Sequence, residues 1–368
     1  MPVSSPKSTR HHTRVFGPAI LVTIVAFFAA YQFVDPAPPR QITLATGNPN
    51  GAYHLFGQAY QALLARNGIE VTLRNTAGSV ENLSLLSDGQ VDVAFVQGGT
   101  AATVENTDTL VSLGSLYFEP LWLFHRLDLP IEHVTDLKNH RVAVGLPGSG
   151  SHSIAMALLD VNHIDSKEAE LVELNTHASI EALEAQQIDA IFAVASPRAP
   201  YIEALLHTPE VALLSFQRAE AYSRRFQFLS SVVLPQGVVS FVNDIPPKDI
   251  ELLAPTANLV AGEDIHPALV GLLLQAATEI HGSGGIFESV GQFPSLAYVE
   301  LPIDPEAARY LRSGPPFLQR FLPFLGCGAG RPHAGHVIAR GGTDVSTISN
   351  HAANVSLASS LAHLPLVP

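Results

Sequence analysis

Strand-like and helix-like patterns of apolar residues alternate along the chain from residue 41. Short apolar runs are typical of buried strands, whereas apolar residues three and four positions apart are typical of amphipathic helices. In order, these patterns predict a strand at 41–46, a helix at 51–65, a strand at 69–75, a helix at 79–89 and a strand at 91–99. Ser79 can cap the second helix and Gly89 can end it. The β-α-β-α-β order predicts a parallel sheet with helices on both faces.

The same alternation resumes in the second half of the chain. Strand-like runs and strand-turn-helix patterns follow one another at 120–126, 134–162, 188–206, 211–214, 230–234 and 253–282. No repeat of fixed period accompanies them. The chain has 368 residues, which is enough for two ordinary domains, so two similar α/β lobes are the simplest prediction.

The lobes can be given approximate boundaries from these patterns. We predict that residues 41–127 and 230–310 form the first lobe and that residues 128–229 form the second. Residues 311–324 would then be a connection.

Three glycine-containing turns lie where a predicted strand ends and a predicted helix begins. They span Thr46–Tyr53, Asn75–Asn82 and Gly145–Ser153. In open α/β sheets, ligands bind outside the carboxyl ends of the strands, where the N–H groups of helix N-termini favour an anion. None of the turns is a dinucleotide fingerprint or a phosphate-binding loop with Lys. Together the three turns favour binding of a small anion such as a carboxylate.

Composition excludes several other functions. The net charge of −13 argues against nucleic acid as a partner, because phosphate binding needs a basic surface. The single cysteine, Cys327, leaves no intrachain disulfide and no multi-cysteine metal site. The sequence has no nucleophile-elbow motif and no recognisable acid–base pair. We therefore expect no enzyme, no metal and no cofactor.

The N-terminus has the pattern of a membrane anchor. Residues 1–14 carry basic residues and no acidic one, and Phe16–Val34 contains no charge at all. A helix of that length spans about 28 Å, close to the hydrocarbon thickness of a bilayer. We predict a cytoplasmic basic end, an uncleaved signal anchor at 15–34 and an extended tether at 35–40. A cleaved signal peptide and a buried core helix remain the alternatives.

Several segments in a fixed order resemble a known family. They include LATGNPNGAYHLFGQAYQALLA, VTLRNTAGSVENLSLLSDGQVDVAFVQGG, SLYFEPLWLF and DLKNHRVAVGLPGSGSHSIA. The series resembles the TAXI family, the extracytoplasmic solute receptors associated with TRAP transporters, from about Gln41 to about Pro323. GSVENL and QVDVAFVQ are its most specific parts.

The resemblance implies a fold, a function and a partner. The fold would be the α/β type II periplasmic-binding-protein fold, in which two hinged lobes close on a solute in the cleft between them. The chain would capture a small anionic solute, such as a carboxylate or the amino acid glutamate, and deliver it to a TRAP-type membrane permease. Together with the N-terminal anchor predicted above, this places the chain at the inner membrane with its bulk in the periplasm. The alternatives are a periplasmic ligand-sensing domain of a regulatory system and, less favoured, a periplasmic enzyme.

The resemblance also implies site residues, carried over by motif position. The candidate ligand contacts are Gly47, Asn48, Gly51, Ala52 and Tyr53 in the first turn, Ser79, Val80 and Asn82 in the second, Gln97 at a strand end, and Pro147, Gly148, Ser149, Gly150 and Ser151 in the third. Trp122 and Arg198 are weaker candidates that can equally be packing or surface residues. The first turn departs from the family pattern, because Asn48-Pro49-Asn50 interrupts its glycines. Solute identity is therefore not carried over.

The composition changes abruptly after Phe324. Residues 325–368 contain no Lys, Glu, Phe, Trp or Tyr and have no apolar periodicity. We hypothesise a frameshift, because the next reading frame can encode a composition typical of a membrane helix. The alternative is a genuine disordered tail. Stop codons in the shifted frame of the gene would exclude the frameshift.

Overall fold

The computed structural model describes residues 22, 23, 25, 38–49, 51–197 and 199–315, and the chain divides into the compact units Met1–Pro38 and Pro39–Pro368. No helix among these described residues is long and apolar enough to cross a membrane. The predicted anchor at 15–34 lies outside them except for three helical residues, and the tail at 325–368 lies outside them entirely. Both therefore stay predictions.

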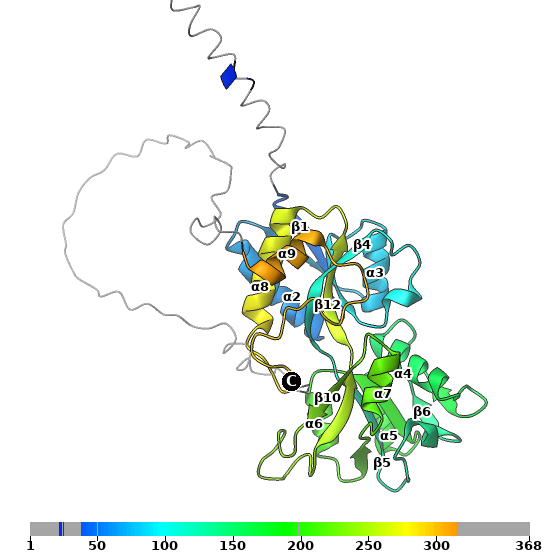
Figure 1. Cartoon of the computed structure of the whole chain (residues 1–368). Coiled ribbons are helices and arrows are strands. Elements are labelled where there is room, and N and C mark those ends of the chain that lie inside the picture. The colour runs from blue at the N-terminus through cyan, green and yellow to red at the C-terminus, as the bar shows by residue number, and fades with distance from the viewer. Residues whose placement is uncertain (1–21, 24, 26–37, 50, 198, 316–368) are drawn as a thin grey trace, which may run out of the picture. The chain divides into compact units, whose positions relative to one another are not determined.

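Two sheets organise the second unit (Figure 1). The sheet of the first lobe has the order β2-β1-β3-β12-β4. Its strands are β1 (Gln41–Ala45), β2 (Glu70–Arg74), β3 (Val93–Gln97), β4 (Leu110–Phe118) and β12 (Thr256–Gly262). β1 pairs in parallel with β2 and β3, as predicted, but β12 is antiparallel to β3 and β4. The predicted parallel pairing is therefore confirmed for the three N-terminal strands, and the sheet is mixed because β12 returns from the other lobe.

Helices cover both faces of this first sheet. They are α2 (Ala52–Ala65), α3 (Ser79–Ser87), η1 (Ala101–Thr103), α8 (Pro267–His281) and α9 (Pro305–Ser313). Successive strand residues point to opposite faces. Phe95 accordingly joins the core under α2 and α8, whereas its neighbours Ala94 and Val96 join the core under α3. The alternating pattern of the strand thus places its side chains in two apolar cores, one on each face of the sheet.

The start of α3 differs from its predicted cap. Gly78, not Ser79, is the N-cap, with φ of 136°. That conformation is open to glycine and strained for other residues. Ser79 is therefore the first helical residue, and its side chain is free to bond elsewhere.

The second lobe is built on a mixed sheet of order β10-β11-β5-β8-β6-β7, to which β9 adds by pairing with β5. Its strands are β5 (Leu121–Arg126), β6 (Arg141–Ala143), β7 (Glu170–Val172), β8 (Ala190–Val194), β9 (Val211–Leu213), β10 (Ser230–Leu234) and β11 (Ile250–Ala254). Its helices are η2 (Val134–Leu137), α4 (Gly150–Val161), α5 (Thr176–Glu184), α6 (Pro200–Leu206) and α7 (Ala219–Arg225). A single large apolar cluster fills this lobe.

The chain crosses between the lobes at positions that the sequence patterns misplaced. The predicted boundaries at 127/128 and 229/230 are wrong, since β5, β10 and β11 all belong to the second sheet. The crossings lie at Glu119–Pro120 and at Pro255, where Glu119 N donates to Pro255 O at 2.8 Å. An apolar strand has the same pattern in either lobe, so only its pairing partners reveal where it belongs.

Candidate functional site

The first predicted turn leads from β1 into α2. Gly51 is the N-cap of α2 and no side chain caps it, so the helix begins with N–H groups that have no acceptor within the helix. Gly51 N donates to Asn48 O at 2.8 Å, which closes the turn. Gly47 is buried, Asn48 is exposed, and Ala52 and Tyr53 are half-buried. The turn thus presents backbone donors and the Tyr53 side chain.

The second turn leads from β2 into α3 and is tied to β3. Ser79 is 3% exposed, and its hydroxyl accepts a hydrogen bond from Gln97 N at 2.9 Å. Val80 follows it on the half-buried side of the helix. Ser79 therefore joins the second turn directly to the end of β3.

Asn82 is placed differently from its predicted role as a ligand contact. It is fully buried, and its amide donates to Thr46 O at 2.6 Å and to Phe95 O at 2.8 Å. Its carbonyl oxygen accepts from the Thr76 hydroxyl at 2.6 Å. All of these partners belong to the protein, so Asn82 positions the strand ends around the site and has no group left for a solute.

The third turn leads from β6 into α4. The Ser149 hydroxyl caps this helix by accepting from His152 N at 3.3 Å. Gly148 has φ of 84°, which favours glycine, and Pro147 is exposed. The Ser151 hydroxyl accepts from Val194 N at 2.9 Å and so fastens α4 to β8. Ser149 and Ser151 thus position the start of α4, where Gly150 is the first helical residue.

Gln97 and Gly150 bring the two lobes into contact. A Cβ placed on Gly150 would lie 2.5 Å from Cδ and 2.6 Å from Nε2 of Gln97, so the amide packs directly over the glycine. Gln97 is only 5% exposed, yet its Nε2 has no hydrogen-bond partner. An unpartnered buried donor at a helix N-terminus is the pattern expected where an anion is to be bound.

Phe228 makes a second contact between the lobes that the sequence did not reveal. It lies between α7 and β10, and its Cβ would be 3.4 Å from a Cβ on Gly98. At Gly99, which has φ of 90°, a Cβ would lie 2.7 Å from the Phe228 ring. The glycine pair at the end of β3 therefore leaves room for this ring. In the sequence, the feature that pointed to this contact was the pair of glycines directly after a predicted strand.

Tyr53 extends the site toward the crossing between the lobes. Its ring stacks on Phe95 with centroids 5.4 Å apart, and its hydroxyl donates to Glu119 Oε2 at 2.8 Å. Burial raises the pKa of Tyr53, the Glu119 carboxylate raises it further, and the neighbouring Ser79 hydroxyl lowers it. Gly150, Gln97, Ser79, Tyr53 and Glu119 thus form one continuous series, which we call the contact row.

Glu119 is a candidate site residue that the sequence analysis did not identify. Burial raises the pKa of its carboxyl to about 7, and the nearby hydroxyls of Tyr53 and Tyr117 offset part of that rise. Glu119 nevertheless keeps some solvent contact, as expected of a group in a deep but open position. The sequence feature that could have identified Glu119 is a single acidic residue between two apolar runs, in SLYFEPLWLF.

The two weaker candidates do not join the contact row. Trp122 is fully buried in the core of the second lobe, and its indole N–H donates to Ala195 O at 2.9 Å. Its ring stacks on Phe124, so Trp122 is a packing residue. Arg198 lies outside the described residues.

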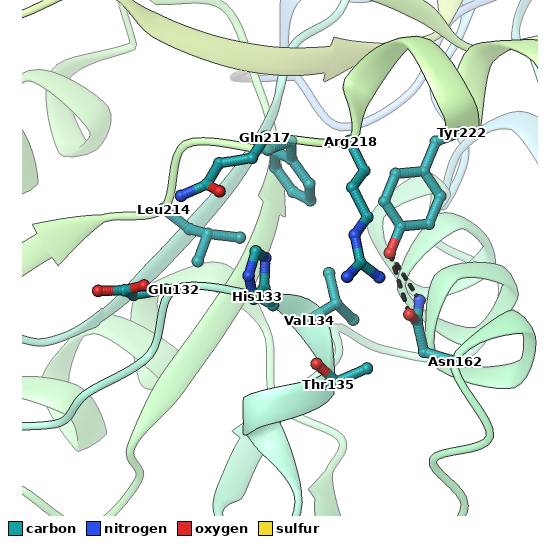
Figure 2. A pocket seen from close by; sticks show the side chains of 10 residues that line it. Glu132, His133, Val134, Thr135, Asn162, Leu214, Gln217, Arg218 and Tyr222 are labelled. Carbon is teal, nitrogen blue, oxygen red and sulfur yellow. Dashed lines mark hydrogen bonds between the residues drawn. The ribbon is translucent and has the colours of Figure 1, made fainter.

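A small cavity elsewhere in the second lobe is not the solute site. It holds about 10 Å³, the space of roughly one water. Figure 2 shows it between η2 and the start of α7, with Asn162 and Tyr222 hydrogen-bonded to each other at its edge. The described residues also contain no group of three or more His, Cys, Asp or Glu that could hold a metal.

Comparison with solved structures gives distant similarities. The aliphatic sulphonate binding protein SsuA of Escherichia coli is 16% identical, with a TM-score of 0.44, over 65% of this chain and 73% of that one. The arginine-bound AbpA of Streptococcus pneumoniae is 19% identical, with a TM-score of 0.43, over 67% and 91%. The GluR0 ligand-binding core with L-glutamate is 16% identical, with a TM-score of 0.43, over 68% and 95%. These similarities are too distant to transfer a ligand to this chain.

Most of the two-lobed region also matches one family model. The match covers residues 44–312, which is more than half of the 368 residues and includes every member of the contact row. The match takes in strands and helices of both α/β lobes and their mixed sheets. The chain therefore belongs to the NMT1-like family.

Proposed function

We propose that this protein is an extracytoplasmic receptor that captures a small anionic solute, a carboxylate or an amino acid, between its two lobes. The observation that carries the proposal is the Gln97 amide, a buried donor without a partner at the N-terminus of α4. Two further helix N-termini, those of α2 and α3, begin at the neighbouring turns. Their N–H groups and the Gln97 amide supply the donors that a carboxylate needs.

The proposed partner is a TRAP-type permease, with the receptor held at the outer face of the inner membrane by its N-terminal segment. This part of the proposal is supported by the TAXI-like segments, above all GSVENL at 78–83 and QVDVAFVQ at 90–97. The contact row uses residues of both segments. In this role the protein catalyses no reaction and needs no metal. A gene for a large fused permease beside this one would support the assignment.

A thermal-shift screen of the full-length protein tests solute capture. A ligand present at about 100 times its Kd stabilises the folded state by about 2.7 kcal/mol. For lobes of this size we expect the melting temperature to rise by about 5–10 °C with the right carboxylate or amino acid.

Neutral sugars and diamines serve as the control ligands and are expected to give no shift. Gln97→Ala removes the unpartnered donor and is expected to reduce the shift while leaving the melting temperature of the free protein nearly unchanged. A folded sample that no carboxylate and no amino acid stabilises would contradict the proposal.

A further inference from the structure

Glu119 occupies the point where the site meets the connection between the lobes. Its backbone N–H is bonded to Pro255 O on the other crossing strand. Its carboxylate accepts from Tyr53 at the start of α2. The same residue therefore contacts a site residue with its side chain and joins the two crossings with its backbone.

The groups around Glu119 come from several elements. Tyr53 faces it from α2, and Tyr117 precedes it on β4. His281 of α8 stacks on Tyr117, and burial lowers the pKa of His281 to about 3, so this imidazole is neutral. Glu288 accepts from the backbone N–H of residue 118, next to Glu119 in the chain. These described neighbours therefore supply hydroxyls, a neutral imidazole and a second carboxylate, but no cation.

At the other end of the contact row, the Gln97 amide and the N-terminus of α4 favour binding of an anion. A negatively charged Glu119 would oppose that binding. A carboxylate near an incoming anion raises the free energy of binding, and partial burial limits solvent screening. Protonation removes this repulsion and turns the same carboxyl into a hydrogen-bond donor. A solute that carries only negative charge is thus favoured by the protonated form of Glu119.

We propose that Glu119 determines which solute charge this receptor accepts: a solute with only negative charge binds to the form in which the Glu119 carboxyl is protonated. The inference rests on the proposed function, since it concerns the same site. Binding at alkaline pH then takes up one proton from solution, which bonds to a Glu119 carboxylate oxygen, for each solute bound. A solute that also carries an ammonium group escapes this requirement.

Titration calorimetry of the full-length protein with fumarate, 2-oxoglutarate and pyruvate tests the inference. These anions stay fully ionised between pH 6 and pH 8. Because the pKa of Glu119 is about 7, most of the protein carries the proton at pH 6 and little of it does at pH 8. We expect the affinity for the anion that binds best to fall about tenfold between these two pH values. Two buffers of different ionisation enthalpy should report close to one proton taken up per solute at pH 8.

Three variants distinguish Glu119 from other titrating groups. Glu119→Gln is expected to bind with equal affinity at both pH values and without proton uptake. Tyr53→Phe removes a hydrogen bond that lowers the pKa of Glu119, so the fall in affinity should move to higher pH. Glu279→Gln makes the same chemical change at an exposed position on α8 and should keep the tenfold pH dependence.

The outcomes separate this inference from the proposed function. Wild-type affinity that is equal at pH 6 and pH 8 overturns the role of Glu119 but leaves solute capture intact. Absence of binding to all three anions at pH 6 also overturns the inference, and solute capture then depends on the amino acids in the thermal-shift screen. If Glu119→Gln fails to fold, Tyr53→Phe still provides a test. The inference is overturned if the pH at which affinity falls is the same in Tyr53→Phe as in the wild type.

Discussion

Gly150→Val is expected to weaken solute binding by at least about 100-fold, equivalent to about 2.7 kcal/mol. Any Cβ at this position would overlap Gln97, whose Cδ would lie 2.5 Å away. Gln97 is 5% exposed and has little room to move aside. The lobes would therefore be held apart at the start of α4, where the solute donors should meet. Calorimetry with the ligand that gives the largest thermal shift measures the effect.

The variant should leave each lobe folded, because valine and glycine differ little at a helix start. Met156→Val introduces the same residue on the exposed side of α4 and is the matched control, with binding expected to be unchanged. Adding Gln97→Ala to Gly150→Val removes the overlapping amide. This double variant should bind better than Gly150→Val alone, although more weakly than wild type. No recovery would show that overlap with Gln97 is not the cause.

Asn82→Ala is expected to lower the free energy of unfolding by about 3 kcal/mol, since it deletes buried hydrogen bonds and leaves their partners unsatisfied. The lost bonds are those to Thr46 O, Phe95 O and the Thr76 hydroxyl. These groups lie on the turns and strand that carry the site. Urea unfolding should show a lower midpoint with an unchanged slope.

Asn75→Ala is the matched control for this prediction. Asn75 lies in the same turn but is exposed, and its carbonyl oxygen accepts only a long bond of 3.4 Å from the Thr46 hydroxyl. We expect a change within about 0.5 kcal/mol. If Asn82→Ala instead left stability unchanged and abolished solute binding, Asn82 would be a ligand contact after all.

Local patterns in the sequence predicted most of the elements and the positions of the three turns. The helix at 51–65 and the strand at 91–99 correspond to α2 and β3. The spacing of apolar residues indicates which face of a helix or strand is buried. A glycine indicates a position where the backbone has a positive φ or where another group packs closely against it. Both signals are contained within a few consecutive residues, so they can be read without knowing the rest of the fold.

The roles of individual site residues were harder to predict. Asn82 and Gln97 are both amides near predicted turns, but one is fully bonded to the protein and the other keeps a free donor. Trp122, a large aromatic residue beside the site segments, packs in the core. Side-chain function depends on which partners reach the polar atoms, and the partners of the Asn82 side chain lie 6 to 36 residues away along the chain.

The sequence by itself determined the two α/β lobes, the turns at the strand ends and the acidic, single-cysteine composition. Only the tertiary structure decided that β5, β10 and β11 belong to the second sheet, that Gln97 packs over Gly150, and that Glu119 meets Tyr53 across 66 residues of chain. The reason is physical: periodicity is fixed by local backbone geometry, whereas strand pairing and polar contacts depend on hydrogen bonds and packing between distant segments.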